Sequence, residues 1–304
     1  IAIDMPMTAE SIAIYLGIVW AGCNVVSIAD SFAAEEIATR LDLGQAQLIF
    51  TQDVVSRGGK TLPLYERVVA ANAPPAIVLD GRTDHPAVPL RRSDITWSEF
   101  IGKEEIDAAV CTPETHSNIL FSSGTTGQPK AIPWTHTTPI KCAADGYLHH
   151  DIHQGEVVAW PTNLGWMMGP WLIYASLINR ATIALYYGAP TGADFLRFVQ
   201  DAQVNMLGVV PSLVRSWRTI NALHGIELSA LRAFSSTGEC SNAEDMHWLM
   251  AQAGYKPVIE YCGGTELAGG YLTGSMIQPA RPASFTTPCL GIDMVLFDET
   301  EMPC

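Results

Sequence analysis

The sequence is poor in charged residues, and poorest in basic ones. Only 16% of its 304 residues are charged, and 17 Lys and Arg face 31 Asp and Glu, for a net charge of -14. A nucleic-acid surface needs clustered Lys and Arg, so this shortage argues against that class of partner. An acidic protein can still bind a nucleotide at a local site. The 48% of hydrophobic residues favours a large α/β body with many buried strands.

The sequence also lacks paired cysteines, a signal peptide and an uninterrupted apolar span. Its seven cysteines are scattered without a CxxC pair, which indicates reduced thiols in an intracellular compartment. Residues 11–29 carry no charge and could be mistaken for a membrane span. Small and polar residues interrupt this run, and no Lys or Arg flanks it. We therefore expect a buried helix that ends near Gly22, followed by a strand over residues 25–28.

The rest of the chain alternates strand and helix patterns. This alternation predicts an α/β fold with mostly parallel sheets flanked by helices. Thr8 fits a helix cap, and residues 81–116, richer in Pro, Asp and Arg, fit a surface connection. Further helices are expected at 32–41 and 194–202. The predicted strands cover residues 1–4, 25–28, 47–51, 76–79, 118–121, 157–160, 181–186, 204–211, 231–239 and 257–261.

One stretch, residues 117–130, reads SNILFSSGTTGQPK. It joins a short apolar strand to six small residues and ends in Pro129 and Lys130. Small residues let backbone N–H groups approach an anion, hydroxyls add donors, and Lys supplies positive charge. The pattern is typical of a polyphosphate-binding loop, and a flexible surface turn is the alternative. It is not a Walker motif, because Ala131 stands where that motif needs Ser or Thr.

This stretch closely resembles the phosphate loop of the adenylate-forming enzymes, which include acyl-CoA synthetases, luciferases and peptide-synthetase adenylation domains. Residues 4–41 also resemble the early βαβ segment of plant acyl-activating enzymes of the acetyl-CoA-synthetase type. The resemblance implies the large N-terminal AMP-binding domain of that fold. It also implies activation of a small-molecule carboxylic acid by ATP and Mg²⁺ to acyl-AMP, and then thioester formation with coenzyme A.

Two later segments resemble parts of the same nucleotide site. Residues 231–239 look like the family segment whose Gly-Glu pair borders adenine, although Cys240 replaces the usual Pro or small residue. Residues 260–266 look like the Tyr-x-x-Thr-Glu region, in which Thr265 would contact the α-phosphate and Glu266 would hold Mg²⁺. The implied catalytic residues are Lys130, Thr265 and Glu266. The implied nucleotide-binding residues are Ser122, Ser123, Gly124, Thr125, Thr126, Gly127, Lys130, Gly238, Glu239, Cys240, Glu260, Tyr261, Cys262, Gly263, Gly264 and Thr265.

The acyl pocket is expected around residues 165–171, GWMMGPW, where the family has a GW segment. Plain core packing is the alternative interpretation. Acetate-specific members carry a bulky Trp shortly before the Thr-Glu pair, whereas this chain has Gly263 and Gly264. We therefore expect a medium-sized or aromatic acid as substrate. The implied acyl-binding residues are Trp166, Met167, Met168, Thr237 and Gly263.

Three histidines follow the helix predicted after Pro139. His149 and His153 are spaced i, i+4, which is compatible with a metal site. No third ligand pattern is evident, so a solvated helix end is the preferred interpretation for His149, His150 and His153.

The chain begins and ends within strand-like sequence, which predicts a partial N-terminal AMP-binding domain over 1–304. We expect subdomains at about 1–110 and 111–304, and a lysine-bearing domain beyond Cys304 that this chain lacks. Without that domain the chain itself should be inactive. The alternatives are a non-catalytic nucleotide- or acyl-binding protein and, less favoured, a P-loop-type NTPase. We expect a peroxisomal or cytoplasmic location and no membrane span, while the oligomeric state stays open.

Overall fold

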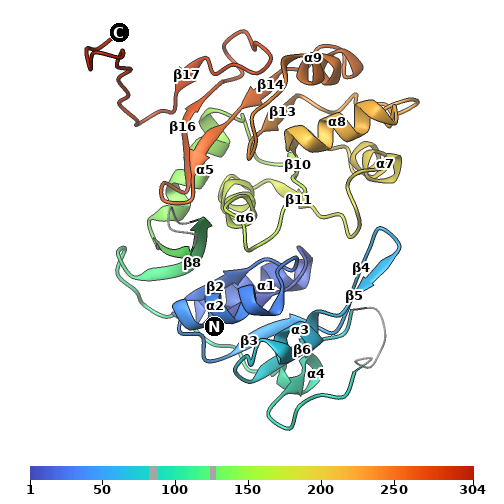
Figure 1. Ribbon diagram of the computed structural model, residues 1–304, viewed down its shortest axis with the longest axis vertical. Coiled ribbons are helices and arrows are strands. Elements are labelled where there is room, and N and C mark those ends of the chain that lie inside the picture. Colours follow the sequence, from blue (N-terminus) through green and yellow to red (C-terminus); the bar gives the residue numbers. More distant parts are fainter. Residues whose placement is uncertain (82–87, 124–127) are drawn as a thin grey trace. The chain divides into compact units, whose positions relative to one another are not determined.

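The computed structural model describes residues 1–81, 88–123 and 128–304 (Figure 1). The chain divides into two compact units. The first contains residues 1–139, 161–173 and 185–189, and the second contains residues 140–160, 174–184 and 190–304. Each unit is built around its own sheet.

The first unit contains a seven-stranded sheet with the order β7-β6-β3-β1-β2-β8-β9, parallel except for the β8–β9 pair. Its strands are β1 (Ala2–Asp4), β2 (Val25–Ile28), β3 (Ile49–Gln52), β6 (Ala76–Leu79), β7 (Ile95–Thr96), β8 (His116–Ser123) and β9 (Pro129–Thr135). A separate hairpin is formed by β4 (Val55–Arg57) and β5 (Lys60–Leu62). The helices are α1 (Ala9–Trp20), α2 (Ala34–Leu43), α3 (Leu64–Ala70) and α4 (Trp97–Phe100).

The first helix begins where the sequence predicts it. Thr8 accepts a hydrogen bond from the backbone of Ser11, and the Ser11 side chain accepts one from the backbone of Thr8, which completes a capping box. From β2 the chain crosses through α2 to β3, on the other side of β1. A doubly wound sheet has its ligand crevice at such a reversal, outside the carboxyl ends of the strands.

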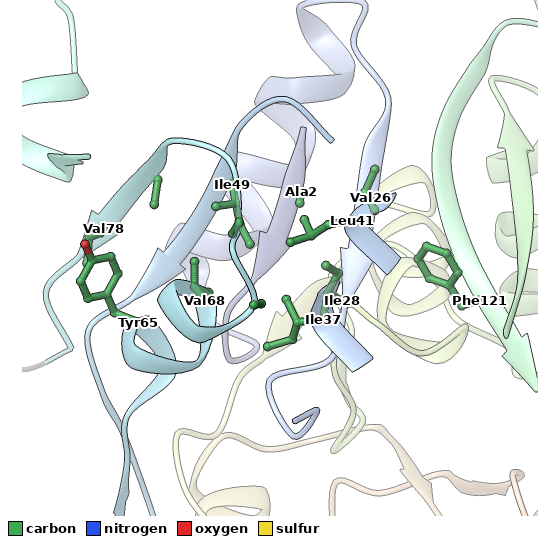
Figure 2. Packing of buried hydrophobic residues seen from close by; sticks show 13 residues of the cluster. Ala2, Val26, Ile28, Ile37, Leu41, Ile49, Tyr65, Val68, Val78 and Phe121 are labelled. Carbon is green, nitrogen blue, oxygen red and sulfur yellow. The ribbon is translucent and has the colours of Figure 1, made fainter. Parts of the chain in front are cut away.

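Aliphatic side chains from the strands and helices of the first unit form its core (Figure 2). Ile28, Ile37 and Ile49 have no solvent exposure, and they come from β2, α2 and β3. Phe121 of β8 packs into the same cluster. The side chains that interdigitate between sheet and helices therefore fix the strand ends on which the site residues stand.

The second unit contains a five-stranded parallel sheet with the order β11-β10-β12-β13-β14 and an antiparallel sheet with the order β15-β16-β17. The parallel strands are β10 (Val157–Ala159), β11 (Thr182–Ala184), β12 (Met206–Val209), β13 (Ala233–Ser236) and β14 (Val258–Glu260). The antiparallel strands are β15 (Cys262–Gly264), β16 (Gly269–Thr273) and β17 (Thr287–Pro288). The helices are α5 (Thr138–Leu148), α6 (Met168–Ile178), α7 (Ala193–Asp201), α8 (Pro211–Thr219) and α9 (Ala243–Gln252), and α5 and α6 contribute residues to both units.

Three features differ from the sequence-based expectation. Residues 129–135 form strand β9, which two prolines had concealed; an edge strand tolerates Pro because its outer N–H groups need no partner. The Gly-rich residues 262–264 form strand β15 instead of a loop. The first sheet includes β8 and β9, so the first unit continues past residue 110, where the sequence predicted a subdomain boundary.

Within the described ranges, no helix is long and apolar enough to cross a membrane. The charge-free run at 11–29 instead contains α1 and β2, as its interrupting residues predicted.

Candidate nucleotide site

The predicted phosphate loop is the connection of a β-hairpin in the first unit. Ser122 lies opposite Lys130, and Ser123 lies opposite Pro129, so the two strands pair up to the base of the loop. Lys130 is exposed on the edge strand. Gly124, Thr125, Thr126 and Gly127 lie outside the described residues. Because a strand and not a helix follows the loop, the arrangement differs from that of a P-loop NTPase.

The segment predicted to border adenine follows β13 in the second unit. Gly238 has a φ of +92°, which residues with a side chain rarely adopt. The carboxylate of Glu239 accepts hydrogen bonds from the backbone N–H of Ser212, at 2.9 Å, and from its hydroxyl, at 2.8 Å. The negative charge of Glu239 thereby lies at the positive, N-terminal end of the α8 helix dipole. Thr237 is half-buried, and Cys240 is exposed.

A buried hydrogen-bond network joins that segment to the end of β14. Glu260 is 5% exposed and accepts a hydrogen bond from the Ser241 hydroxyl at 2.6 Å. The Ser241 and Ser236 hydroxyl oxygens lie 3.0 Å apart, and the backbone N–H of Ala283 donates to the other Glu260 oxygen at 3.2 Å. Burial raises the pKa of Glu260, although the hydroxyl and backbone donors oppose this shift.

The phenol of Tyr261 points away from solvent. It is 2% exposed, and its hydroxyl donates to Asp145 at 2.6 Å, an oxygen that also accepts from the backbone N–H of Gly270. The other Asp145 oxygen accepts from the Lys141 ammonium at 2.6 Å. Burial and the neighbouring Asp145 carboxylate raise the pKa of Tyr261 well above its usual value. The Tyr261 ring is therefore not accessible to a nucleotide.

Thr265 and Glu266 stand at the tip of the β15–β16 hairpin. Residues 265–268 form its turn, in which the N–H of Leu267 donates to the carbonyl of Gly264 at 3.1 Å. Thr265 is half-buried and Glu266 is exposed, so a hard oxygen ligand is accessible there. A single carboxylate together with phosphate oxygens is a common Mg²⁺ site, so this donor is chemically suitable for Mg²⁺.

The two glycines before this turn have different surroundings. A Cβ atom at Gly263 would lie 2.1 Å from the carbonyl oxygen of Gly269 in the paired strand. Among the described residues, a Cβ atom at Gly264 would meet only a Glu266 carboxylate oxygen, at 3.3 Å. The geometry therefore favours Gly264 over Gly263 as the position that could carry a side chain. Cys262, earlier in the strand, donates its thiol to the Tyr271 hydroxyl at 3.1 Å.

The predicted acyl segment belongs to the first unit. Gly165 packs on the end of β2, where a Cβ would lie 2.2 Å from the Ala29 nitrogen. Trp166 is 50% exposed and meets Phe32 edge-to-face, with ring centroids 5.6 Å apart. Met167 is half-buried and Met168 is 8% exposed. The exposed indole of Trp166 is accessible to a ligand, whereas the Met168 side chain is buried in the protein.

Two of the three histidines belong to a packed core, contrary to the solvated helix end that the sequence suggested. His149 and His150 are each 1% exposed. His150 bonds the Ser235 hydroxyl at 2.9 Å, and burial lowers the pKa of His150 to about 4. Only His153, which lies 2.6 Å from Asp151, is substantially exposed. For His149 and His150 the prediction was wrong because partners distant in the chain cover them: Gly274 and Leu290 bond His149, and Ser235 bonds His150.

One group of described residues could offer three metal ligands, with the ligand atoms of Asp145, His149 and Cys289 within 4.8 Å of one another. The backbone N–H of Leu290 donates to Nε2 of His149, so that nitrogen is unprotonated, and Nδ1 donates to the Gly274 carbonyl. Both ring nitrogens are thereby occupied. Burial raises the pKa of the Cys289 thiol to about 12, so the group fits a satisfied core better than a metal centre.

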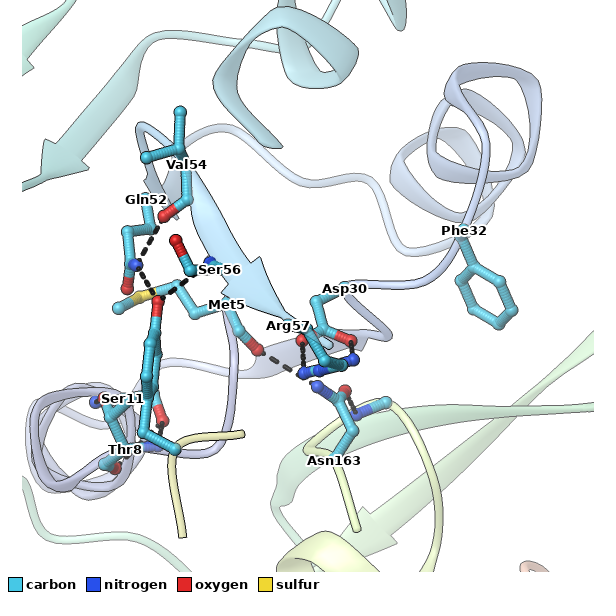
Figure 3. A network of polar contacts seen from close by, with 12 residues as sticks. Met5, Thr8, Ser11, Asp30, Phe32, Gln52, Val54, Ser56, Arg57 and Asn163 are labelled. Carbon is cyan, nitrogen blue, oxygen red and sulfur yellow. Dashed lines mark hydrogen bonds and ion pairs between the residues drawn. The ribbon is translucent and has the colours of Figure 1, made fainter. Parts of the chain in front are cut away.

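Sequence analysis missed a polar network at the carboxyl ends of β1 to β3 (Figure 3). Arg57 forms a bidentate pair with the Asp30 carboxylate, with the shorter distance 2.6 Å. Asn163 donates to the Met5 carbonyl at 3.1 Å and accepts from the Gly165 backbone at 2.9 Å. The sequence signal was present, since Asp4 is the last residue of β1, and Asp30, Asp53 and Asp80 come just after β2, β3 and β6.

A family model described as AMP-binding enzyme matches residues 1–304. The chain therefore belongs to the AMP-binding enzyme family.

Its relatives include plant proteins. The chain is 54% identical over 309 residues to "Probable acyl-activating enzyme 17, peroxisomal" of Arabidopsis thaliana and, equally, to "Hexanoyl-CoA synthase" of Cannabis sativa. Each alignment covers 100% of this chain and 43% of the relative. Identity to an acetyl-coenzyme A synthetase of Marinomonas sp. is 29%, over 98% of this chain and 48% of that protein. The chain thus spans less than half the length of these relatives.

A solved structure, acetoacetyl-CoA synthetase from Streptomyces lividans, superposes with a TM-score of 0.89. The two are 22% identical, and the match covers 100% of this chain and 49% of that one. The similarity confirms the predicted fold class, with mostly parallel sheets flanked by helices.

Proposed function

We propose that this chain is the nucleotide-binding part of an ATP-dependent acid–thiol ligase. The observation that carries the proposal is the family match over the whole chain, together with a Ser/Thr/Gly loop that ends in Lys130 on a rigid hairpin. A carboxylate oxygen attacks the α-phosphorus of ATP, and pyrophosphate leaves. The coenzyme A thiol then attacks the acyl carbon, and AMP leaves.

The residues named from the sequence have complementary roles in the first step. The loop from Ser122 to Lys130 cradles the pyrophosphate that leaves, and Thr265 contacts the α-phosphate. Glu266 would hold Mg²⁺, which would supply positive charge against the phosphates. Preorganised charge and alignment supply most of the catalysis in such a reaction. Lys130 belongs to the first unit, and Thr265 and Glu266 to the second, so their meeting at one phosphate site stays a prediction.

Pyrophosphate exchange that depends on a carboxylic acid tests this function in the full-length enzyme. We expect exchange with ATP, Mg²⁺ and acid, and a loss on the order of 10²-fold in Glu266→Gln, the scale of removing one preorganised electrostatic partner. Glu227→Gln, which changes an exposed carboxylate elsewhere in the second unit, is the matched control. Nucleotide binding without any exchange would favour the alternative of a non-catalytic binding protein.

The acid is proposed to be medium-sized, in line with the name of the hexanoyl-CoA synthase relative. The absence of a side chain at Gly264 leaves room for methylene groups, each worth about 0.8 kcal/mol when buried. Exchange rates measured from acetate to decanoate should peak above acetate, and Gly264→Trp should shift the peak toward shorter acids. A wild-type preference for acetate, or an unchanged profile in the Trp variant, would contradict the pocket argument.

The enzyme is proposed to act in the peroxisome or cytoplasm, because the name of an Arabidopsis relative includes "peroxisomal". A fluorescent protein fused to the N-terminus, which leaves any C-terminal address free, would locate it.

A further inference from the structure

The loop that follows β13 is closed at its base by two serine hydroxyls. Ser236 is the last residue of β13 and Ser241 follows the loop, and their hydroxyl oxygens are 3.0 Å apart. Between them lie Thr237, which is expected to line the acyl pocket, and Gly238, Glu239 and Cys240, which are expected to bind the nucleotide. The backbone N–H of Tyr261 also donates to the Ser236 carbonyl at 2.8 Å. The start of the loop is therefore fixed by backbone pairing, and its end by side chains.

The end of the loop is held by one buried carboxylate. Ser241 donates to Glu260 at 2.6 Å, a short bond of the charge-assisted kind, and Glu260 is 5% exposed. The second Glu260 oxygen accepts from the backbone N–H of Ala283, at 3.2 Å. Glu260 thus ties together the loop after β13, the end of β14 and the segment near residue 283. With both oxygens engaged and little exposure, it is poorly placed to contact a nucleotide itself.

We propose that Ser241 and Glu260 are positioning residues that set the adenine-side loop of the nucleotide site. The proposal rests on the proposed function, because it assigns the loop after β13 to adenine. The Glu260 carboxylate acts through Ser241, and the loop it holds makes the contacts. Glu239 supports the same loop from outside, through its bonds to the first turn of α8.

The experiment uses the full-length enzyme with ATP, Mg²⁺ and hexanoate in the exchange assay. Ser241→Ala should raise KM for ATP about tenfold, the effect of losing a hydrogen bond to a charged group. Because the loop binds substrate and transition state alike, kcat should change less than twofold. Ser241→Thr, which keeps the hydroxyl, should restore KM for ATP.

Hydrogen–deuterium exchange reports the position of the loop independently of activity. Amides of residues 237–241 should exchange faster in Ser241→Ala than in wild type or Ser241→Thr. Thr300→Ala is the matched control, because it removes a hydroxyl that donates at 2.7 Å to the exposed Asp298. It should leave both KM for ATP and loop exchange unchanged.

The outcomes separate the possible failures. Unchanged amide exchange in Ser241→Ala overturns the role of Ser241 in holding the loop. Faster exchange with an unchanged KM for ATP overturns the positioning role. A wild-type enzyme without acid-dependent exchange overturns the proposed function before any variant is compared, and the adenine assignment of the loop falls with it.

Discussion

At the scale of single residues, Asp4 stands out because neither carboxylate oxygen has a hydrogen-bond partner among the described residues. It ends β1, beside the chain reversal of the first sheet, and is 1% exposed. Burial and the nearby Asp30 carboxylate raise the pKa of Asp4 well above its usual value, while Arg67 opposes the shift. A carboxyl group in such surroundings keeps its proton well above pH 4.

This predicts a pH-dependent loss of stability. The unfolded chain releases the Asp4 proton near pH 4 and the folded chain retains it, so stability falls as the pH rises from about 4 to the raised folded pKa. Asp4→Asn cannot ionise and should escape this loss. Its free energy of unfolding in urea should exceed that of wild type by a margin that widens with pH, by up to about 1.4 kcal/mol per pH unit.

Asp201→Asn, a change at an exposed residue at the end of α7, is the control and should follow wild type. Parallel pH profiles for wild type and Asp4→Asn would show that the folded Asp4 is already ionised.

Residue types near the site were predictable from sequence, but their orientations were not. Glu260 and Tyr261 follow one another at the end of a strand, and both looked available to a nucleotide. The structure buries Glu260 against Ser241 and the Tyr261 ring against Asp145. Asp145 lies 116 residues earlier in the chain, and no local pattern links two such distant positions. Such long-range partners determine which side chains remain accessible.

At the scale of elements, the β15–β16 hairpin carries Thr265 and Glu266 in its turn. The strand residues next to this turn are glycines. Gly263 pairs with Gly270, and Gly264 pairs with Gly269. The close approach at Gly263 leaves no space for a Cβ atom, whereas Gly264 is restricted only by a flexible carboxylate. The two neighbouring glycines therefore have separable roles.

We expect Gly263→Ala to destabilise the protein by about 1–3 kcal/mol, the usual cost of overpacking against backbone that cannot relax. Gly264→Ala, the matched control one residue on, should stay within about 0.5 kcal/mol of wild type. Calorimetric unfolding of both variants measures the difference. Equal free energies of unfolding would mean that the two strands of the hairpin can move apart without loss of stability. They would also remove the reason to choose Gly264 for the Trp variant.

Elements with a strong local pattern were predicted well. The strand at residues 76–79 agrees residue for residue with β6, and the cap at Thr8 is present. The missed strand β9 contains Pro129 and Pro133, which normally signal a break; only its position at the sheet edge, a tertiary fact, makes it a strand. Burial of His149 likewise depends on the carbonyl of Gly274, 125 residues away.

At the scale of the whole molecule, the segments named in the proposed function are distributed over both units. The first contains the hairpin with Lys130 and the segment with Trp166, and the second contains the adenine-side loop and Glu266. The sequence predicted all four parts through their resemblance to family motifs. It could not assign them to units, because the chain passes from one unit to the other more than once.

The final prediction is that residues 1–304 alone bind ATP·Mg weakly but do not form acyl-CoA. The proposed phosphate loop, the adenine-side loop and Glu266 all lie in this chain, and we expect them to support weak nucleotide binding. The chain spans only 43% of the length of the plant relatives, and thioester formation is proposed to need the whole enzyme.

Titration calorimetry should therefore detect binding of ATP·Mg, and Glu266→Gln should weaken it. A thioester assay with hexanoate and coenzyme A should give product from the full-length enzyme and none from residues 1–304. Robust thioester formation by the 304-residue chain would show that the lysine-bearing domain is dispensable. Undetectable ATP binding, in a chain whose unfolding remains cooperative, would instead contradict the assignment of the loop between Ser122 and Lys130.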